Sequence, residues 1–169
     1  MRIENYKIAD WEVLETGVFL DENEGWILIK SIPSDYQLDG FKLLNKNHIV
    51  EISKVENSSV IQKVIELKEI KVQNPNDFKF DNTIEILKRL EAKYGCFEFQ
   101  DEVEEELFYG TLGEYDDKSF SIDFIKSDGT IDLDFDEVFE MKDIRTISFE
   151  SNYFNSISLL YNHCKKNRK

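Results

Sequence analysis

Residues 107–130 read LFYGTLGEYDDKSFSIDFIKSDGT, and this stretch decides the fold. Leu107–Leu112 has the composition of a strand, and apolar and polar side chains alternate over Ser119–Phe124, so two strands are predicted, at Leu107–Leu112 and Ser119–Ile125. Asp116-Asp117-Lys118 lies between the two strands, and Ser127-Asp128-Gly129 follows the second. Both are turn sequences. The stretch therefore predicts antiparallel strands joined by short turns.

Two more strands and a helix are predicted on the C-terminal side of this stretch. Thr130–Phe135 and Arg145–Phe149 have the composition of strands. From about Tyr153 to His163, apolar residues recur at helical spacing. This helix is followed by cations that suit a helix C-terminus, namely Lys165, Lys166, Arg168 and Lys169.

A helix and a strand are predicted on the N-terminal side. Asp81 or Asn82 can cap the start of the helix, and Gly95 stands where a left-handed C-terminal cap is expected. Phe97–Gln100 then has the pattern of a strand.

The first half of the chain combines the same kinds of element. Strands are predicted at Trp11–Leu20, Trp26–Ile32, Phe41–Leu44 and Ile49–Val55. From Ser59 the apolar spacing becomes helical, and Asn74-Pro75-Asn76-Asp77 interrupts the pattern. We therefore predict an α+β, mainly β fold with two modules: residues 1–74 with one amphipathic helix, and residues 75–169 with one helix before the strands and one at the C-terminal end. Whether the modules form one compact unit stays open.

The two halves show a faint internal repeat. Ile49-Val50-Glu51-Ile52-Ser53 is echoed by Ile144-Arg145-Thr146-Ile147-Ser148. Before these segments we match Gly25 with Gly110, as glycines that begin a strand, and Asp39-Gly40 with Asp128-Gly129, as turns. A helix follows each copy. Either a duplication or a chance similarity of β-rich segments accounts for this order.

Residues 107–130, continued by Asp143–Phe149 and Tyr153, resemble the pattern of Sm-like or SH3-like small β-barrels. The resemblance lies in a glycine-bearing strand, an acidic turn, a long strand, an Asp-Gly turn and a closing Ile-x-x-Ile-x-Phe strand. Uncharacterised bacterial proteins with tandem modules of this kind look similar over most of the length. The resemblance implies a fold of two small barrels. Sm proteins that bind RNA use Asn and a basic residue in loops where this chain has Asp-Asp-Lys, so the match does not extend to RNA binding.

The charge of the chain is confined to one segment. Residues 96–140 contain sixteen Asp or Glu and two Lys, a net charge of −14, which equals the formal charge of the whole chain. Residues 1–95 carry −4 and residues 141–169 carry +4. Such a concentration predicts a surface for a basic protein partner and disfavours nucleic acid.

The sequence also predicts where the protein resides. It has neither an apolar leader nor a membrane-spanning stretch, so we expect a cytoplasmic protein that does not bind membranes. Cys96 and Cys164, the only two cysteines, are expected to be free thiols.

The acidic residues fall into a loop, a turn and a predicted strand. Asp132, Asp134 and Asp136 alternate with Leu133 and Phe135, so a strand would place the three carboxylates on one face. A solvated face is the alternative to a binding face. A straight strand cannot wrap a metal ion, and none is predicted. The candidate partner-binding residues are Asp101, Glu102, Glu104, Glu105, Glu106, Glu114, Asp116, Asp117, Asp132, Asp134, Asp136, Tyr109 and Tyr115.

No sequence motif predicts catalysis or a cofactor. His48 and His163 lack a partner at a recognisable motif spacing, and Gly110-Thr111-Leu112-Gly113 lacks the Lys and the length of a phosphate loop. Trp11, Trp26, Tyr36, Tyr109 and Tyr115 are the aromatic residues best placed to reach the surface. We expect most of them to lie in the core, and one or two beside the acidic residues could anchor an interface.

We therefore expect a non-enzymatic protein that captures a basic partner. An immunity protein or antitoxin that neutralises a toxin such as a nuclease is the most concrete form of this hypothesis. The alternative is a small-barrel scaffold or regulatory module that binds a peptide or subunit through a strand edge.

Overall fold

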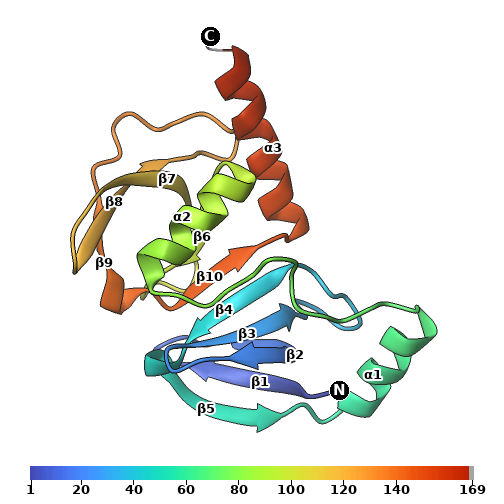
Figure 1. Cartoon of the computed structure of the whole chain (residues 1–169). Coiled ribbons are helices and arrows are strands. Elements are labelled where there is room, and N and C mark those ends of the chain that lie inside the picture. Colours follow the sequence, from blue (N-terminus) through green and yellow to red (C-terminus); the bar gives the residue numbers. More distant parts are fainter. Residues whose placement is uncertain (168–169) are drawn as a thin grey trace. The chain divides into compact units, whose positions relative to one another are not determined.

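The computed structural model describes residues 1–167 and divides the chain into two compact units (Figure 1). Unit 1 is Met1–Phe78 and unit 2 is Lys79–Lys169. Both combine antiparallel strands with helices, so the α+β, mainly β class is confirmed. Of the cations expected beyond the last helix, Arg168 and Lys169 lie outside the described residues.

Unit 1 is a five-stranded antiparallel sheet followed by a helix. Its sheet order is β5-β1-β2-β3-β4. The elements are β1 (Ile3–Ile8), β2 (Leu14–Glu22), β3 (Trp26–Ser31), β4 (Phe41–Asn45), the 3-10 turn η1 (Lys46–His48), β5 (Ile49–Lys54) and α1 (Ser58–Leu67). The strand predicted at Trp11–Leu20 corresponds to β2, and its predicted start at Trp11 is wrong. Trp11 lies before β2, where its carbonyl accepts from the Lys7 ammonium.

Both faces of the unit 1 sheet carry buried apolar residues. Successive side chains of a strand point to opposite faces, so one strand supplies residues to both. One face packs Ile3, Val18 and Ile32 against Ile61 and Ile65 of α1. The other holds Tyr6, Ile8, Trp11, Ile27, Ile29 and Leu44. Trp11 and Trp26 are only 2% and 5% exposed and so belong to the core, as expected for most of the five aromatic candidates.

Unit 2 begins with a helix, and its five strands have the same order as those of unit 1. Its sheet order is β10-β6-β7-β8-β9. The elements are α2 (Thr83–Tyr94), β6 (Phe97–Gln100), β7 (Phe108–Tyr115), β8 (Ser119–Phe124), β9 (Val138–Glu140), the 3-10 turn η2 (Met141–Asp143), β10 (Thr146–Phe149) and α3 (Asn152–Asn167). Asn82 caps α2 by accepting from Glu85 N at 3.0 Å, and Gly95 closes it at a φ of 88°, as predicted.

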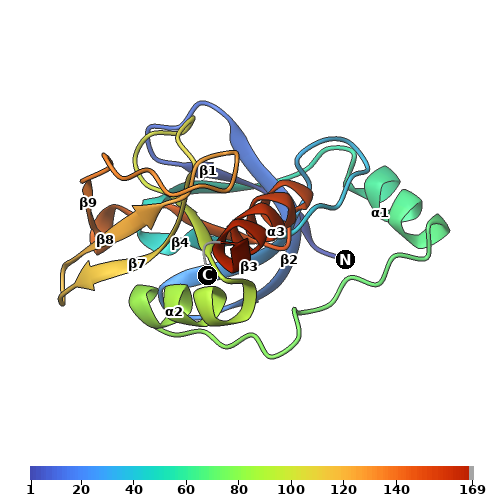
Figure 2. The ribbon, with the colours of Figure 1, turned by 90° about the horizontal axis from the view of Figure 1, so that it is seen from above.

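The two faces of the unit 2 sheet differ in chemistry. One carries a cluster of phenylalanines, in which Phe139 lies 4.8 Å from Phe99 and 4.7 Å from Phe108 between ring centroids. The other faces α3 and contains Tyr109, whose ring contacts Tyr153 and Phe154. Figure 2 shows α3 and the sheet from above.

The two units repeat one another strand by strand. Each sheet places its fifth strand beside its first, and each has a 3-10 turn before the fifth strand and a helix after it. Ile32 N donates to Thr16 O at 2.8 Å, and Ile125 N donates to Tyr109 O at 2.7 Å. The second strand shifts register after Phe19 in unit 1 and after Leu112 in unit 2.

The repeat confirms one sequence correspondence and corrects another. Ile52 pairs with Tyr6, and Ile147 pairs with Phe99, so Ile49–Ser53 and Ile144–Ser148 are equivalent. The counterpart of Gly110 is Gly17 and not Gly25, because both lie opposite the end of the third strand. The Asp-Gly turns are not equivalent either, since Gly40 directly precedes β4 whereas Gly129 packs on α3.

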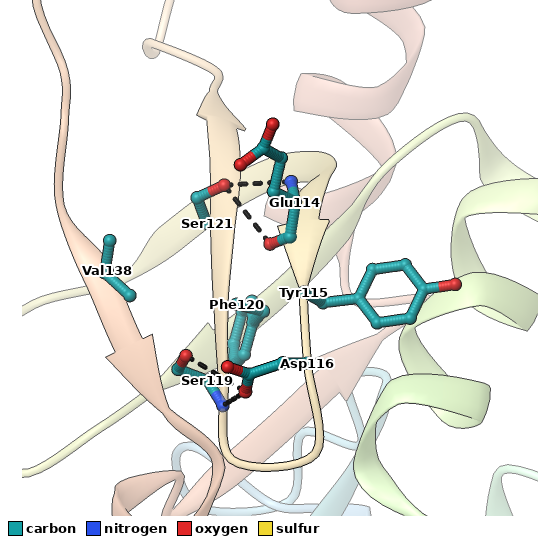
Figure 3. Close-up of a pocket in the computed structure, with 7 residues that line it drawn as sticks. All are labelled: Glu114, Tyr115, Asp116, Ser119, Phe120, Ser121 and Val138. Atoms are coloured by element: carbon teal, nitrogen blue, oxygen red, sulfur yellow. Dashed lines mark hydrogen bonds between the residues drawn. The ribbon is translucent and has the colours of Figure 1, made fainter.

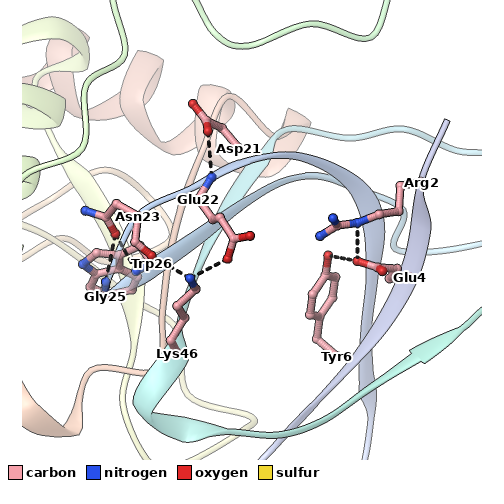
Figure 4. A network of polar contacts seen from close by, with 9 residues as sticks. All are labelled: Arg2, Glu4, Tyr6, Asp21, Glu22, Asn23, Gly25, Trp26 and Lys46. Atoms are coloured by element: carbon pink, nitrogen blue, oxygen red, sulfur yellow. Dashed lines mark hydrogen bonds and ion pairs between the residues drawn. The ribbon is translucent and has the colours of Figure 1, made fainter.

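The hairpin between the second and third strands closes in the same way in both units. In unit 2, Asp116 Oδ1 accepts from Lys118 N and Ser119 N, both at 2.8 Å (Figure 3). In unit 1, Asn23 Oδ1 accepts from Gly25 N at 3.0 Å and from Trp26 N at 2.8 Å (Figure 4). Short polar side chains favour such turns because they hydrogen-bond to the backbone just ahead of them. Asp116 is therefore a structural residue first.

Candidate partner-binding surface

The acidic segment belongs entirely to unit 2, where it occupies strands and the connections between them. The connections are residues 101–107 between β6 and β7, the hairpin between β7 and β8, and residues 125–137 between β8 and β9. Because loops carry few packing constraints, they are common places for binding residues.

Two of these connections converge at Glu137. Partial burial raises the pKa of this carboxyl, and the negative charges of Asp101, Glu106 and Asp136 raise it further. Carboxylates of the β6–β7 loop are thus within electrostatic range of Glu137 at the end of the β8–β9 loop. We call Asp101, Glu106, Asp136 and Glu137 the acidic patch. Three of these were predicted; Glu137 was missed because its local sequence does not distinguish it from its neighbours.

The acidic patch lacks internal compensation. Within residues 1–167, none of its four carboxylates forms an ion pair. Asp101 Oδ1 accepts only a long hydrogen bond, 3.2 Å from Val103 N. Like charges that lie together without cations repel one another. The patch is therefore a candidate binding site for the cationic groups of a partner.

The predicted strand at Thr130–Phe135 is wrong. Ile131 makes an isolated bridge with Ile125, and residues 132–137 form a turn and irregular backbone. Asp132 Oδ1 accepts from Asp134 N at 3.1 Å, which bends the chain, and Phe135 stacks on Phe124 at 4.7 Å. Local hydrogen bonding by Asp competes with a sheet ladder in this way.

This irregular backbone separates the three alternating carboxylates. Asp132 is half-buried beside Lys126, whereas Asp134 and Asp136 are exposed. Leu133 between them is 90% exposed. Asp132, Asp134 and Asp136 therefore do not share one strand face, and only Asp136 joins the acidic patch.

The remaining acidic candidates occupy two places. Glu102 and Glu105 are exposed in the β6–β7 loop, and Glu104 is half-buried where its carbonyl accepts from Gln100 Nε2 at 2.7 Å. Glu114, Asp116 and Asp117 lie at the β7–β8 hairpin beside a shallow hollow that Val138 also lines (Figure 3). Backbone N–H groups of Lys118 and Ser119 lower the pKa of Asp116.

The two candidate tyrosines have opposite environments. Tyr115 is 50% exposed, and the Lys88 ammonium lies 4.7 Å from its ring centroid. Tyr109 is only 5% exposed and its hydroxyl donates to the buried Glu98, so the expectation that it reaches the surface is wrong. Burial, followed by the charge of Glu98, raises the pKa of Tyr109.

A pocket of about 540 Å³ lies in unit 2 beside Tyr109. It is lined by Leu107, Tyr109, Phe124, Ile125, Lys126, Ser127, Asp132, Tyr153 and Ile157. Of these, only Tyr109 and Asp132 were predicted as site residues. Among the others, the internal repeat could have pointed to Ile125, whose counterpart Ile32 lies in the core of unit 1.

The groups that could support other chemistry are dispersed. No three His, Cys, Asp or Glu side chains in residues 1–167 are arranged to hold a metal ion. Cys96 is buried, Cys164 is partly exposed and both are free thiols, as predicted. No described helix is long and apolar enough to cross a membrane.

Comparison with known proteins gives no relative. No family model, no curated protein and no solved structure matches the chain.

Proposed function

We propose that this protein is a non-enzymatic binding protein that captures a basic protein partner through unit 2. The observation that carries the proposal is the convergence of Asp101 and Glu106 with Asp136 and Glu137 from a separate loop. In its most specific form, the protein is an immunity protein or antitoxin whose partner is a basic toxin such as a nuclease.

The electrostatics support a binding role for the acidic patch. The repulsion among its four carboxylates gives no stability to the fold, whereas the positive charges of a partner would offset this repulsion. A nuclease surface that attracts phosphates carries the complementary field. Steered association of such pairs can reach roughly 10⁸–10⁹ per molar per second at low salt.

Small-barrel modules are the proposed form of the two units. The support is the antiparallel five-stranded order with the fifth strand beside the first, the 3-10 turn before the fifth strand, and the accompanying helix. These features agree with the Sm-like and SH3-like resemblance of the sequence. The excess of carboxylates in unit 2 disfavours nucleic acid as its ligand.

A second candidate function is supported by β5. This strand ends the order of the unit 1 sheet, and its Val50 and Ile52 are 64% and 48% exposed. An edge strand with exposed apolar residues can pair with an added strand. A scaffold that binds a peptide there would retain its affinity at high salt.

Binding of a fluorescent ten-residue lysine peptide tests the charge contribution. A variant that combines Asp101→Asn, Glu106→Gln, Asp136→Asn and Glu137→Gln should weaken binding about tenfold at low salt. The matched control, Glu24→Gln with Asp35→Asn, Glu51→Gln and Glu56→Gln, removes the same charge from exposed sites of unit 1. Equal losses in the two variants would show that net charge alone acts.

The toxin hypothesis has its own test. A gene beside the one for this protein should encode a Lys- and Arg-rich toxin domain, and the purified protein should inhibit that toxin. The association rate should fall steeply as salt rises. Inhibition that is indifferent to both salt and the acidic patch variant would overturn electrostatic capture.

A further inference from the structure

Strand β5 forms an unprotected edge of the unit 1 sheet. Within residues 1–167, its only neighbouring strand in unit 1 is β1 (Figure 1). β5 spans Ile49–Lys54 and contains no proline, and two of its aliphatic side chains, Val50 and Ile52, are exposed. The outer backbone N–H and C=O groups of such a strand are available to another strand.

β9, which ends the order of the unit 2 sheet, is an edge of a different kind. It spans only Val138–Glu140, and the exposed carboxylates of Glu137 and Glu140 lie at its two ends. Short length and charge are two ways in which proteins prevent edge strands from associating. β5 is longer, and its single acid, Glu51, is balanced by its single base, Lys54. The β5 edge of this acidic chain is therefore neutral.

The exposed residues of β5 continue a buried cluster on one face of the sheet. Ile52 lies opposite Tyr6 of β1, which is fully buried, so Ile52 shares the face of the cluster that contains Tyr6 and Ile8. Alternation along the strand places Val50 and Lys54 on this face as well, and residues 51 and 53 on the other. Another strand beside β5 would extend the cluster.

Both charged residues of β5 lie opposite a residue of the other sign in their own chain. Glu51 is opposite Lys7, and Lys54 is opposite Glu4. Opposite charges at such positions are favourable in an antiparallel sheet. A second β5 would therefore meet an edge whose own charges already have partners of the other sign beside them.

We propose that β5 pairs antiparallel with β5 of a second copy of this chain, in the register that places Ile52 opposite Ile52 of the second copy. A two-fold axis perpendicular to the sheet relates the two copies and keeps every side chain on its own face. Such an axis allows only pairs whose residue numbers differ by an even number.

Charge selects one register among those that the axis allows. A register centred on Glu51 or on Lys54 would place two like charges directly opposite, which destabilises a sheet. A register centred on Val50 would use the irregular start of β5, where the pairing with β1 shifts. One centred on Ser53 would bring no two apolar residues together.

The register centred on Ile52 has none of these faults. It opposes Ile52 to Ile52, and it lays the aliphatic stem of Lys54 beside Val50. Glu51 then lies opposite Ser53, whose hydroxyl can donate to a carboxylate. The edge is thus complementary to itself, which favours a second copy over an unrelated peptide as its occupant.

Dimerisation is independent of the proposed function, because β5 belongs to unit 1 and the acidic patch belongs to unit 2. A contact of one strand pair is smaller than a standard interface, so we expect a dissociation constant of about 10–100 µM. Two chains that each carry a charge of −14 repel one another, so the dimer should become more stable as salt rises. Capture of a basic partner has the opposite dependence on salt.

Sedimentation velocity of the full-length protein tests for the dimer. The dimer fraction should rise with protein concentration and with salt. A protein that stays monomeric at about 1 mM would overturn the proposal. Open-ended oligomers would also overturn it, because two-fold pairing of β5 closes after two copies.

Cysteine cross-linking tests the register. Directly opposite residues of an antiparallel pair have Cα atoms about 4.5–5.5 Å apart, which suits a disulfide. In a Cys164→Ser background, Ile52→Cys should therefore form a covalent dimer under mild oxidation. Val50→Cys is the matched control, because the two copies of residue 50 would lie about 13 Å apart along the strands. Cross-linking of Val50→Cys and not of Ile52→Cys would overturn the register.

A charge at the two-fold axis tests the pairing without a new covalent bond. Ile52→Lys opposes two ammonium groups and should abolish the dimer. Val60→Lys adds the same charge on α1, at a residue that is 49% exposed compared with 48% for Ile52, and should leave the dimer in place. Circular dichroism shows whether both variants fold. Undiminished dimerisation of Ile52→Lys would contradict pairing through β5.

The same variants separate dimerisation from electrostatic capture. The acidic patch variant should retain the dimer, and Ile52→Lys should bind the lysine peptide as Val60→Lys does. Loss of the dimer in the acidic patch variant would contradict pairing through β5. A monomeric protein that still binds the lysine peptide through the acidic patch would refute the dimer and preserve electrostatic capture.

Discussion

The Tyr109 hydroxyl donates to the Glu98 carboxylate across β6 and β7, at the place where unit 1 joins the Thr16 hydroxyl to Asn5 Oδ1 at 2.7 Å. Both pairs link the second strand to the first on the face that α3 or α1 covers. A neutral pair in one unit is thus replaced by a larger, charged pair in the other. The tyrosine ring also extends to the pocket and to Tyr153.

The buried tyrosines predict sensitivity to alkali. Burial raises the pKa of Tyr6, Tyr94 and Tyr109 above the ordinary value of 10.0. Their neutral forms support the fold below pH 10, and this contribution is lost at higher pH because only the unfolded chain ionises readily. Absorbance at 295 nm should show these tyrosines ionising late, together with unfolding. Tyr109→Phe should remove one late group; early ionisation of all tyrosines would contradict the structure.

Replacement of the equivalent glycines should destabilise both units. A Cβ at Gly17 would lie 2.8 Å from Lys30 O, and a Cβ at Gly110 would lie 3.0 Å from Asp123 O. Gly17→Ala and Gly110→Ala should each lower the free energy of unfolding by about 1–3 kcal/mol, measured by denaturant titration. Gly25→Ala, where the new Cβ would lie 4.0 Å from Asn23 Oδ1, is the control and should change the free energy of unfolding little.

The Asx turns predict that Asn and Asp are interchangeable at equivalent positions. Asp116→Asn and Asn23→Asp retain the accepting oxygen, whereas Asp116→Ala removes it and should destabilise the hairpin turn. Because the pKa of Asp116 is lowered, its contribution is present above the ordinary pKa of 3.8 and is lost as pH falls. Asp116→Asn should lack this contribution to stability, so its free energy of unfolding should fall less as the pH is lowered. Equal stability of Asp116→Asn and Asp116→Ala at pH 7 would argue against the turn.

The two thiols should differ in reactivity. Burial raises the pKa of Cys96 to about 11, so little thiolate forms at pH 8. Cys164 is partly exposed on α3. A chromogenic disulfide reagent should titrate one thiol in the native protein and two after denaturation. Cys164→Ser should leave almost no fast reaction; rapid labelling of that variant would show that Cys96 is accessible.

Local patterns predicted most of the regular elements. The caps at Asn82 and Gly95 and the alternation of β8 depend on residues near one another in sequence, so they could be predicted directly. β1 was missed because its buried residues, Ile3, Tyr6 and Ile8, do not alternate strictly. Residues 130–135 do alternate, yet the Asp132 hydrogen bond and the stacking of Phe135 override the pattern.

The candidate site was less predictable because it depends on contacts between distant segments. The acidic loop 101–106 was expected to matter, but its convergence with Glu137 is a tertiary property. The pocket was not predicted, since its lining comes from the β6–β7 loop, β7, β8, the β8–β9 loop and α3. Tyr109 was placed at a surface because a tyrosine in an acidic, alternating segment gives no local sign of a buried Glu98 partner.

The matched hairpin turns have a consequence for how such a protein can change its partners. Asn23 and Asp116 perform one structural task with nearly the same hydrogen bonds, yet only Asp116 is an acid. Negative charge can therefore be gained at a turn without a new backbone shape. In a chain with two equivalent units, the charge of one unit can change while the other keeps its charge. Substitutions that adapt the protein to a new partner therefore need not destabilise the fold.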